Sequence, residues 1–155
     1  MKLKLNNILA YSHQGKREYQ EDSFGFGDFF LIVSDGVGGL AKGNIASKIV
    51  VDHFKEAYRS GLFRGEDIEV EVKTVVDSCL SALLDYANQY PESYGMGATL
   101  AMVIQVQDTF YSIHIGDSRV YLLDPQGDIK WRSTDHSLVQ ELFTAGIITE
   151  EELTT

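Results

Sequence analysis

The sequence predicts an α+β fold in which helices pack outside antiparallel sheets. Short strand-like segments come first along the chain, and two long helical segments, each with an apolar face, follow them. Further strand-like segments then succeed one another through short turns, and short connections join antiparallel neighbours. Strands, helices and hairpin strands in this order are typical of the α+β class.

The first part of the chain is predicted to form strands. Residues 6–13 alternate well enough between apolar and polar side chains to predict a first strand, which ends at a turn over 15–16. A second strand is expected over 23–26 and a third over 29–34, with residues 27–28 as the hairpin turn between them. The third segment is an uninterrupted apolar run, which is typical of a fully buried strand.

Two amphipathic helices are predicted in the middle of the chain. Asn44 is expected to cap the first helix, which runs to about Arg59, and a second helix is expected over Asp67–Asn88. At ~1.5 Å per residue the second helix would be roughly 33 Å long, enough to cross the face of a sheet. The residues expected on its inward face are Ile68, Val72, Val75, Val76, Cys79, Leu80, Leu83, Leu84 and Ala87.

The last third of the chain is predicted to return to strands. A run of strands opens at 95–99 and continues over 99–105, 110–115, 119–123 and 129–132. A short helix is expected over Ser137–Ala145, and Thr149 with Glu152 is expected to form a capping box for another helix. Because that helix has barely begun when the chain stops, we expect the sequence to be the first part of a longer domain.

Composition and charge narrow the class of protein. A chain of 155 residues with 44% hydrophobic and 23% charged residues fits one soluble domain. Its net charge of −10 argues against binding to nucleic acid or to an anionic membrane. The single cysteine, Cys79, excludes an internal disulfide and a Cys-rich zinc site, and its aliphatic neighbours indicate a core thiol. We find neither a membrane-spanning run nor a signal peptide, and therefore expect a cytoplasmic protein.

The most informative stretch is 29–39, in which the apolar strand ends in Ser34 and Asp35 before a glycine-rich loop. A carboxylate at the mouth of a buried strand, beside backbone that glycine leaves accessible, suits a hard divalent cation. The other interpretation is a strand followed by an ordinary Asp-Gly hairpin turn. Taken alone, this stretch favours the turn, but two other acidic stretches change the balance.

Acidic residues are predicted at the ends of three strands: Glu21 with Asp22, Asp35, and Asp117. Oxygen ligands without cysteine or suitably spaced histidine favour Mg²⁺ or Mn²⁺ over Zn²⁺. Arg17 lies just upstream of Glu21, and its planar guanidinium suits a pair of phosphate oxygens. Metal ions and an arginine around a small anion are what metal-assisted phosphate hydrolysis requires, because the ions polarise the phosphoryl group and activate a bound water.

Five short motifs follow one another along the chain. They are REYQEDS at 17–23, SDGVGG at 34–39, GATL at 97–100, IGDSRVY at 115–121 and TDHSLVQEL at 134–142. Each motif is weak evidence alone, but their joint order and spacing are specific. Together they resemble the motifs of the metal-dependent (PPM-type, or type 2C) serine/threonine protein phosphatases, and in particular those of bacterial members. The resemblance covers the whole chain and implies that residues 1–155 are the N-terminal portion of such a catalytic domain.

The resemblance also implies an architecture and a metal site. It implies an α-β-β-α sandwich of two antiparallel sheets, with two Mg²⁺ or Mn²⁺ ions at one end of the paired sheets and a third ion in some members. By position, Asp35 would bridge both metals and the Gly36 carbonyl would bind one of them. Glu21 and Asp22 would hold metal-bound water, and Asp117 would match the aspartate that some members use for the third ion.

Other residues are expected to bind the substrate or to stabilise the structure around the site. Arg17 would bind the phosphate of a phosphoprotein substrate. Ser118 and Arg119 are expected to secure the local turn. Asp135 and His136 precede the region that borders the substrate cleft in this family, and His136 is expected to be structural, because residues at a helix entry usually cap or pack.

The chain departs from the family pattern in three ways. Gln20 stands where the family often has asparagine, which affects only local hydrogen bonding. Val37 stands where some members carry a histidine proposed as general acid, so water would have to protonate the leaving group. The family also takes two further metal-binding aspartates, and the last strands of both sheets, from later sequence that does not follow Thr155 here.

The leading hypothesis is hydrolysis of phosphoserine and phosphothreonine in proteins by a metal-activated water, in a protein that works with a cognate Ser/Thr kinase. Residues 1–155 alone are expected to show no more than trace activity, because part of the metal site would be missing. One alternative is a non-catalytic phosphoprotein-binding or regulatory module of the same fold with an incomplete metal site. Another is a purely structural α+β domain, which the joint spacing of the motifs disfavours.

Overall fold

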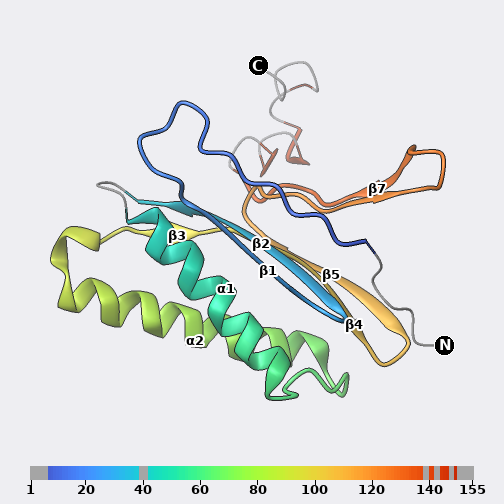
Figure 1. Cartoon of the computed structure of the whole chain (residues 1–155), viewed down its shortest axis with the longest axis horizontal. Helices are drawn as coiled ribbons and strands as arrows, with labels where there is room; N and C mark the ends of the chain where they lie inside the picture. Colours follow the sequence, from blue (N-terminus) through green and yellow to red (C-terminus); the bar gives the residue numbers. More distant parts are fainter. Residues whose placement is uncertain (1–6, 39–41, 138–139, 142–143, 147–148, 150–155) are drawn as a thin grey trace.

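The computed structural model describes residues 7–38, 42–137, 140–141, 144–146 and 149 (Figure 1). In chain order the elements are β1 (Asp22–Gly27), β2 (Phe30–Val37), α1 (Gly43–Arg59), α2 (Ile68–Gln89), the 3₁₀ turn η2 (Pro91–Ser93), β3 (Gly97–Ala98), β4 (Leu100–Val106), β5 (Thr109–Ile115), β6 (Tyr121–Leu123) and β7 (Ile129–Arg132). This order confirms the predicted α+β class.

Two antiparallel sheets contain all of these strands. The main sheet has the order β1-β2-β4-β5, and β3 pairs with the end of β2. The second sheet is the hairpin of β6 and β7. Helices α1 and α2 cover one face of the main sheet, and the β6–β7 hairpin lies on the other side (Figure 1). The main sheet therefore has one face on the helices and one face directed away from them.

The core forms between the helices and the inner face of the main sheet. Its largest fully buried apolar side chains are Phe54 of α1, Ile32 of β2, and Met102 and Ile104 of β4. Cys79 of α2 belongs to this core, and burial raises the pKa of its thiol to about 11. The thiol is therefore protonated at neutral pH and packs as a small apolar group, as the sequence predicts.

Alternation along β2 decides which side chains face away from the helices. Phe30, Ile32 and Ser34 are buried toward the core, whereas Val33 is 49% exposed on the other face. Because successive side chains of a strand point to opposite faces, Asp35 shares the outward face with Val33. The carboxylate of Asp35 therefore lies on the side of the sheet that faces β6 and β7.

The predicted first strand over 6–13 is wrong for residues 7–13, which form no strand. Leu9 and Tyr11 are 95% and 88% exposed. The segment runs over the outward face of β1 and β2, and a cavity of about 290 Å³ lies between them. Alternation alone cannot supply a strand's hydrogen-bonding partner, and no other strand of the described residues pairs with this segment.

The helix predictions were right in extent, but the predicted N-cap of the first helix was wrong. Helix α1 begins at Gly43 after Lys42, so Asn44 is not its N-cap. Helix α2 begins at Ile68, one residue after the predicted start, and Asp67 caps it, because the Asp67 carboxylate accepts a hydrogen bond from the Val70 N–H at 3.2 Å.

The apolar face of α2 is also less buried than predicted. Leu80 and Leu84 are 53% and 61% exposed, because the apolar stripe is wider than the surface that the helix packs against. No helix in the described part of the chain is long and apolar enough to cross a membrane. The expected helix over 137–145 lies partly, and the capping residue Glu152 wholly, outside the described residues.

Candidate metal centre

Two aspartates face each other at one end of the main sheet. In the antiparallel register of β1 and β2, Asp22 is the direct partner of Asp35. Directly opposed residues of an antiparallel pair project from the same face, so the two carboxylates lie on the outward face together. The sequence predicted both residues for one site, but only the register shows that they are paired.

The environment of Asp35 disfavours its negative charge. Burial raises the pKa of the Asp35 carboxyl above its ordinary value, and the charges of Asp22 and Asp117 raise it further, whereas Arg17 lowers it. Asp35 Oδ1 is buried and has no hydrogen-bond partner among the described residues. An unpaired buried carboxylate oxygen beside two other carboxylates is costly unless a cation binds it. The site therefore fits a hard cation.

Gly36 lies where the end of β2 meets the start of α1. A Cβ atom at position 36 would lie 1.9 Å from the carbonyl oxygen of Gly43, and one at position 43 would lie 2.4 Å from Glu21 Oε1 and 2.7 Å from the Gly36 carbonyl oxygen. Both positions require glycine, because any side chain would overlap these backbone and carboxylate atoms. This close approach holds the Gly36 carbonyl beside the first residue of α1.

Glu21 joins β1, β2 and α1. Its Oε1 accepts a hydrogen bond from the Gly43 N–H at 3.2 Å, and its backbone carbonyl accepts from the Gly36 N–H at 3.1 Å and from Ser47 Oγ at 2.6 Å. A carboxylate at a helix N-terminus is favoured by the helix dipole and satisfies a free N–H group. Glu21 thus supplies the cap that Asn44 was predicted to supply.

Arg17 lies beside Glu21, with its side chain 68% exposed. Its Nη1 is 3.8 Å from Glu21 Oε2, and its charge reaches Asp35. Its ion-pair partner is thus the glutamate four residues later in the sequence. The guanidinium therefore lies next to the acidic cluster of Glu21, Asp22 and Asp35 and remains open to solvent.

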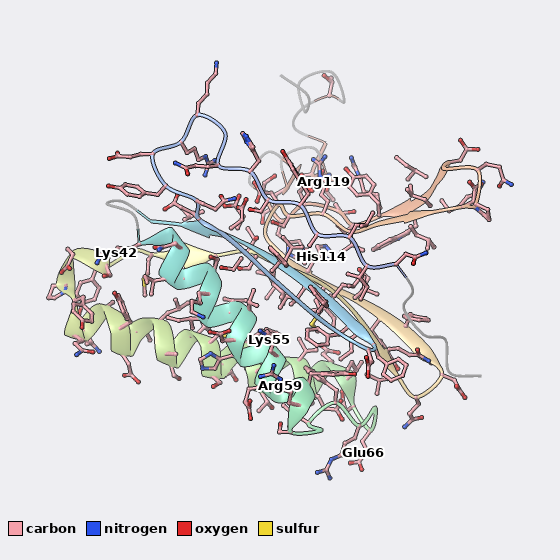
Figure 2. All side chains as sticks on the ribbon, viewed as in Figure 1. Lys42, Lys55, Arg59, Glu66, His114 and Arg119 are labelled. Carbon is pink, nitrogen blue, oxygen red and sulfur yellow. The ribbon has the colours of Figure 1, made fainter. Side chains whose placement is uncertain are left out.

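Asp117 is exposed in the turn after β5, and segment 133–136 packs against this turn. The His136 N–H donates to the Gly116 carbonyl at 2.8 Å, and Arg119 donates to both carboxylate oxygens of Asp135, at 2.7 and 2.5 Å. The rings of His114 and His136 stack with centroids 4.7 Å apart. Figure 2 shows His114 and Arg119 on the side of the main sheet away from α1. Arg119 thus secures the turn, as predicted.

Sequence reasoning missed the supporting hydroxyl groups of the centre. The Asp35 N–H donates to Thr99 Oγ1 at 2.9 Å, and Ser34 Oγ donates to the Thr99 carbonyl at 2.6 Å. The GATL motif contains Thr99, but only the pairing of β2 with β3 shows that Thr99 lies against Asp35. Within the described part of the chain, no group of three or more His, Cys, Asp and Glu side chains could hold a metal ion by itself. Water and backbone carbonyl groups would have to complete any coordination.

A comparison with known families agrees with these features. The model of the protein phosphatase 2C family matches residues 10–144. The chain belongs to the protein phosphatase 2C family. The described fold, with two antiparallel sheets and helices packed on the main sheet, matches solved structures of that family.

Curated relatives of the chain include bacterial proteins named serine/threonine phosphatases. The chain is 35% identical over 125 residues to the serine/threonine phosphatase Stp of Listeria innocua, an alignment that covers 79% of the chain and 49% of the relative. It is 34% identical over 149 residues to the serine/threonine protein phosphatase PstP of Mycobacterium tuberculosis, covering 94% of the chain and 28% of PstP. The chain thus spans about half the length of Stp and a smaller share of PstP.

Solved structures of the protein phosphatase 2C family superimpose on the chain. The Mycobacterium tuberculosis phosphatase PstP/Ppp gives a TM-score of 0.76 at 29% identity, over 97% of this chain and 60% of that chain. The phosphatase Stp1 of Staphylococcus aureus gives 0.78 at 28% identity, over 98% and 63%. The catalytic domain of PstP in complex with two manganese ions gives 0.76 at 30% identity, over 97% and 61%.

Proposed function

We propose that this chain is the N-terminal portion, residues 1–155, of a catalytic domain that hydrolyses phosphoserine and phosphothreonine in proteins. The observation that carries the proposal is the buried Oδ1 of Asp35, which has no hydrogen-bond partner among the residues that the structure describes and lies in an acidic cluster beside an exposed arginine. Membership of the protein phosphatase 2C family and relatives named as serine/threonine phosphatases support it. The relative that was solved with two manganese ions supports Mn²⁺ or Mg²⁺ as the cofactor.

The residues at the motif positions can each be given a role in this chemistry. Asp35 and the Gly36 carbonyl would bind metal directly, and Glu21 and Asp22 would act through water. Asp117 would serve a third ion where one binds. When bound, divalent ions supply the charge that polarises the phosphoryl group and lowers the pKa of coordinated water.

The chain's own groups would bind and orient the substrate. The exposed guanidinium of Arg17 presents paired donors to phosphate oxygens, and its ion pair with Glu21 at 3.8 Å directs it toward the acidic cluster. Val37 is 62% exposed and carries no proton to donate, so solvent would protonate the leaving alkoxide. The substrate would be a phosphoprotein, made by a cognate Ser/Thr kinase in the cytoplasm.

Two structural observations favour the alternative of a non-catalytic phosphoprotein-binding module. The Glu21 carboxylate already caps Gly43 and pairs with Arg17, and the described residues hold no three-ligand group. Under this alternative, Arg17 would bind phosphate without hydrolysis.

The two functions can be distinguished by measuring whether residues 1–155 hydrolyse a phosphothreonine peptide or only bind it. The proposal predicts trace, Mn²⁺-dependent phosphate release that Asp35→Asn abolishes and that Asp28→Asn, at the far end of the same strand pair, leaves unchanged. Peptide binding without any Mn²⁺-dependent release would support the regulatory module. Absence of both release and binding would contradict both functions.

A further inference from the structure

Thr99 lies between β3 and β4 and is 8% exposed. Its backbone N–H donates to the Asp35 carbonyl at 2.8 Å, and its Oγ1 accepts from the Asp35 N–H at 2.9 Å. The Asp35 peptide groups are therefore held on both sides by a single residue. Of these two bonds, only the one to Oγ1 depends on the side chain.

The same hydroxyl reaches the turn that carries Asp117. Thr99 Oγ1 is 2.6 Å from Ser118 Oγ. A hydroxyl can donate one hydrogen bond while it accepts others, so Oγ1 can accept from Asp35 and bond to Ser118 at once. The hydroxyl thus links the backbone of one acidic residue to the neighbour of another.

The methyl group of Thr99 contacts the other side of that turn. Gly116 has φ +93°, and a Cβ atom built on it would lie 2.8 Å from Thr99 Cγ2. The methyl therefore lies against Gly116 while the hydroxyl bonds to Ser118. The two branches of one side chain contact the two residues that flank Asp117.

We propose that Thr99 is a positioning residue that holds the Asp117 turn at a fixed place relative to Asp35. Threonine is suited to this role because valine would lack the hydroxyl and serine would lack the methyl. The charge of Asp117 contributes to the environment of Asp35, so the two carboxylates are close enough to interact. The consequence for metal binding rests on the proposed function, whereas the positioning itself does not.

Two variants of Thr99 and one control test the proposal. Thr99→Val removes the hydroxyl at nearly constant shape, and Thr99→Ser removes only the methyl. Thr109→Val is the same chemical change on an exposed residue of β5, where Thr109 pairs with Val106 at the far end of β4 and β5. Hydrogen exchange followed by mass spectrometry measures the amide exchange rates of residues 34–37 and 115–120 in the metal-free chain. Electron paramagnetic resonance of free Mn²⁺ measures the affinity of each variant for the metal.

Thr99→Val should accelerate exchange of the Asp35 amide by about tenfold, because one hydrogen bond is lost. Its Mn²⁺ affinity should fall by roughly tenfold, the lower end of the range for groups that support metal ligands. Thr99→Ser should keep the Asp35 amide protected and accelerate exchange only at 115–120. Thr109→Val should match the wild type in both measurements.

Two results would overturn the proposal. One is a folded Thr99→Val variant in which exchange at 34–37 and at 115–120 stays at the wild-type rate. The other, which decides the matter if Thr99→Val does not fold, is a Thr99→Ser variant with unchanged exchange at 115–120. If the wild-type chain does not bind Mn²⁺, the proposed function fails, but the exchange rates still decide the role of Thr99.

Discussion

Asp22 and Asp35 are direct partners across the antiparallel pair of β1 and β2, with their carboxylates on the same face. Like charges in this arrangement destabilise a sheet. Asp35 Oδ1 is also buried without a partner among the described residues, and Arg17 compensates only partly from an exposed position. The pair is therefore costly in the metal-free chain, and a bound cation would relieve that cost.

Asp35→Asn should stabilise the metal-free chain. The substitution removes the charge that burial and Asp22 disfavour, and such relief of a functional site is worth about 1 kcal/mol. In Mn²⁺ the order should reverse, because only the wild type gains stability from the ion. Urea unfolding in a chelator and in Mn²⁺ measures both effects, and a less stable Asp35→Asn variant in the chelator would show that Asp35 has a structural partner.

Arg17→Ala should weaken phosphopeptide binding and leave Mn²⁺ affinity nearly unchanged. The expected loss is roughly 1.5–3 kcal/mol, the range for a hydrogen bond to a charged group. Arg64→Ala, in the connection between α1 and α2, is the matched control. Calorimetric titration with peptide and with Mn²⁺ separates the two effects, and loss of Mn²⁺ binding in the variant would contradict the assignment of Arg17 to phosphate.

Gly36→Ala should destabilise the chain strongly. The new Cβ would overlap the carbonyl of Gly43, and β2 or α1 would have to shift, at a cost of about 3 kcal/mol. Gly97→Ala, on the strand paired with the same end of β2, is the control, because a Cβ there meets nothing within 4 Å. Thermal unfolding of both variants checks this, and equal stability would mean that the start of α1 does not pack on β2.

The ion pair of Asp135 and Arg119 should make stability depend on pH in the acid range. The hydrogen bonds from Arg119 lower the pKa of Asp135 below its ordinary value of 3.8. Because the folded pKa is depressed, this contribution is fully present above the unfolded-state pKa and is lost as pH falls through the folded one. Asp135→Asn should therefore cost about 1 kcal/mol at pH 7, a figure that allows for solvent screening of the partly exposed pair.

Urea unfolding at pH 7 and at pH 3 measures this contribution. The difference in unfolding free energy between the wild type and Asp135→Asn should shrink at pH 3. Asp77→Asn is the control, because Asp77 and its partner Lys73 are 58% and 71% exposed, and the pair should contribute little at either pH. A difference for Asp135→Asn that is the same at both pH values would rule out the ion pair as its source.

Local patterns predicted the parts of the fold that depend on neighbouring residues. The apolar run before Asp35 predicted the buried strand β2, and Asp67 predicted the start of α2. The strand expected over 6–13 failed because alternation shows that a segment can pair but not whether a partner is present.

The arrangement of the centre depends on contacts between distant residues. Glu21 caps a helix that begins 22 residues later, and Thr99 meets Asp35 only because β3 pairs with β2. A pattern of neighbouring residues cannot reveal contacts between residues that lie this far apart in the sequence. The motifs predicted that these acidic residues form one site, but the strand registers that place Asp22 opposite Asp35 had to come from the structure.

Mn²⁺ binding to the wild type, Asp35→Asn and Asp28→Asn tests the central claim most directly. Asp28 lies in the turn at the other end of β1 and β2, so its substitution makes the same change in net charge away from the centre. Electron paramagnetic resonance of free Mn²⁺ should show binding to the wild type and to Asp28→Asn, and affinity at least about 100-fold lower for Asp35→Asn, the scale expected when a main ligand is lost. Equal Mn²⁺ affinity of all three proteins would contradict the claim that Asp35 organises a metal centre.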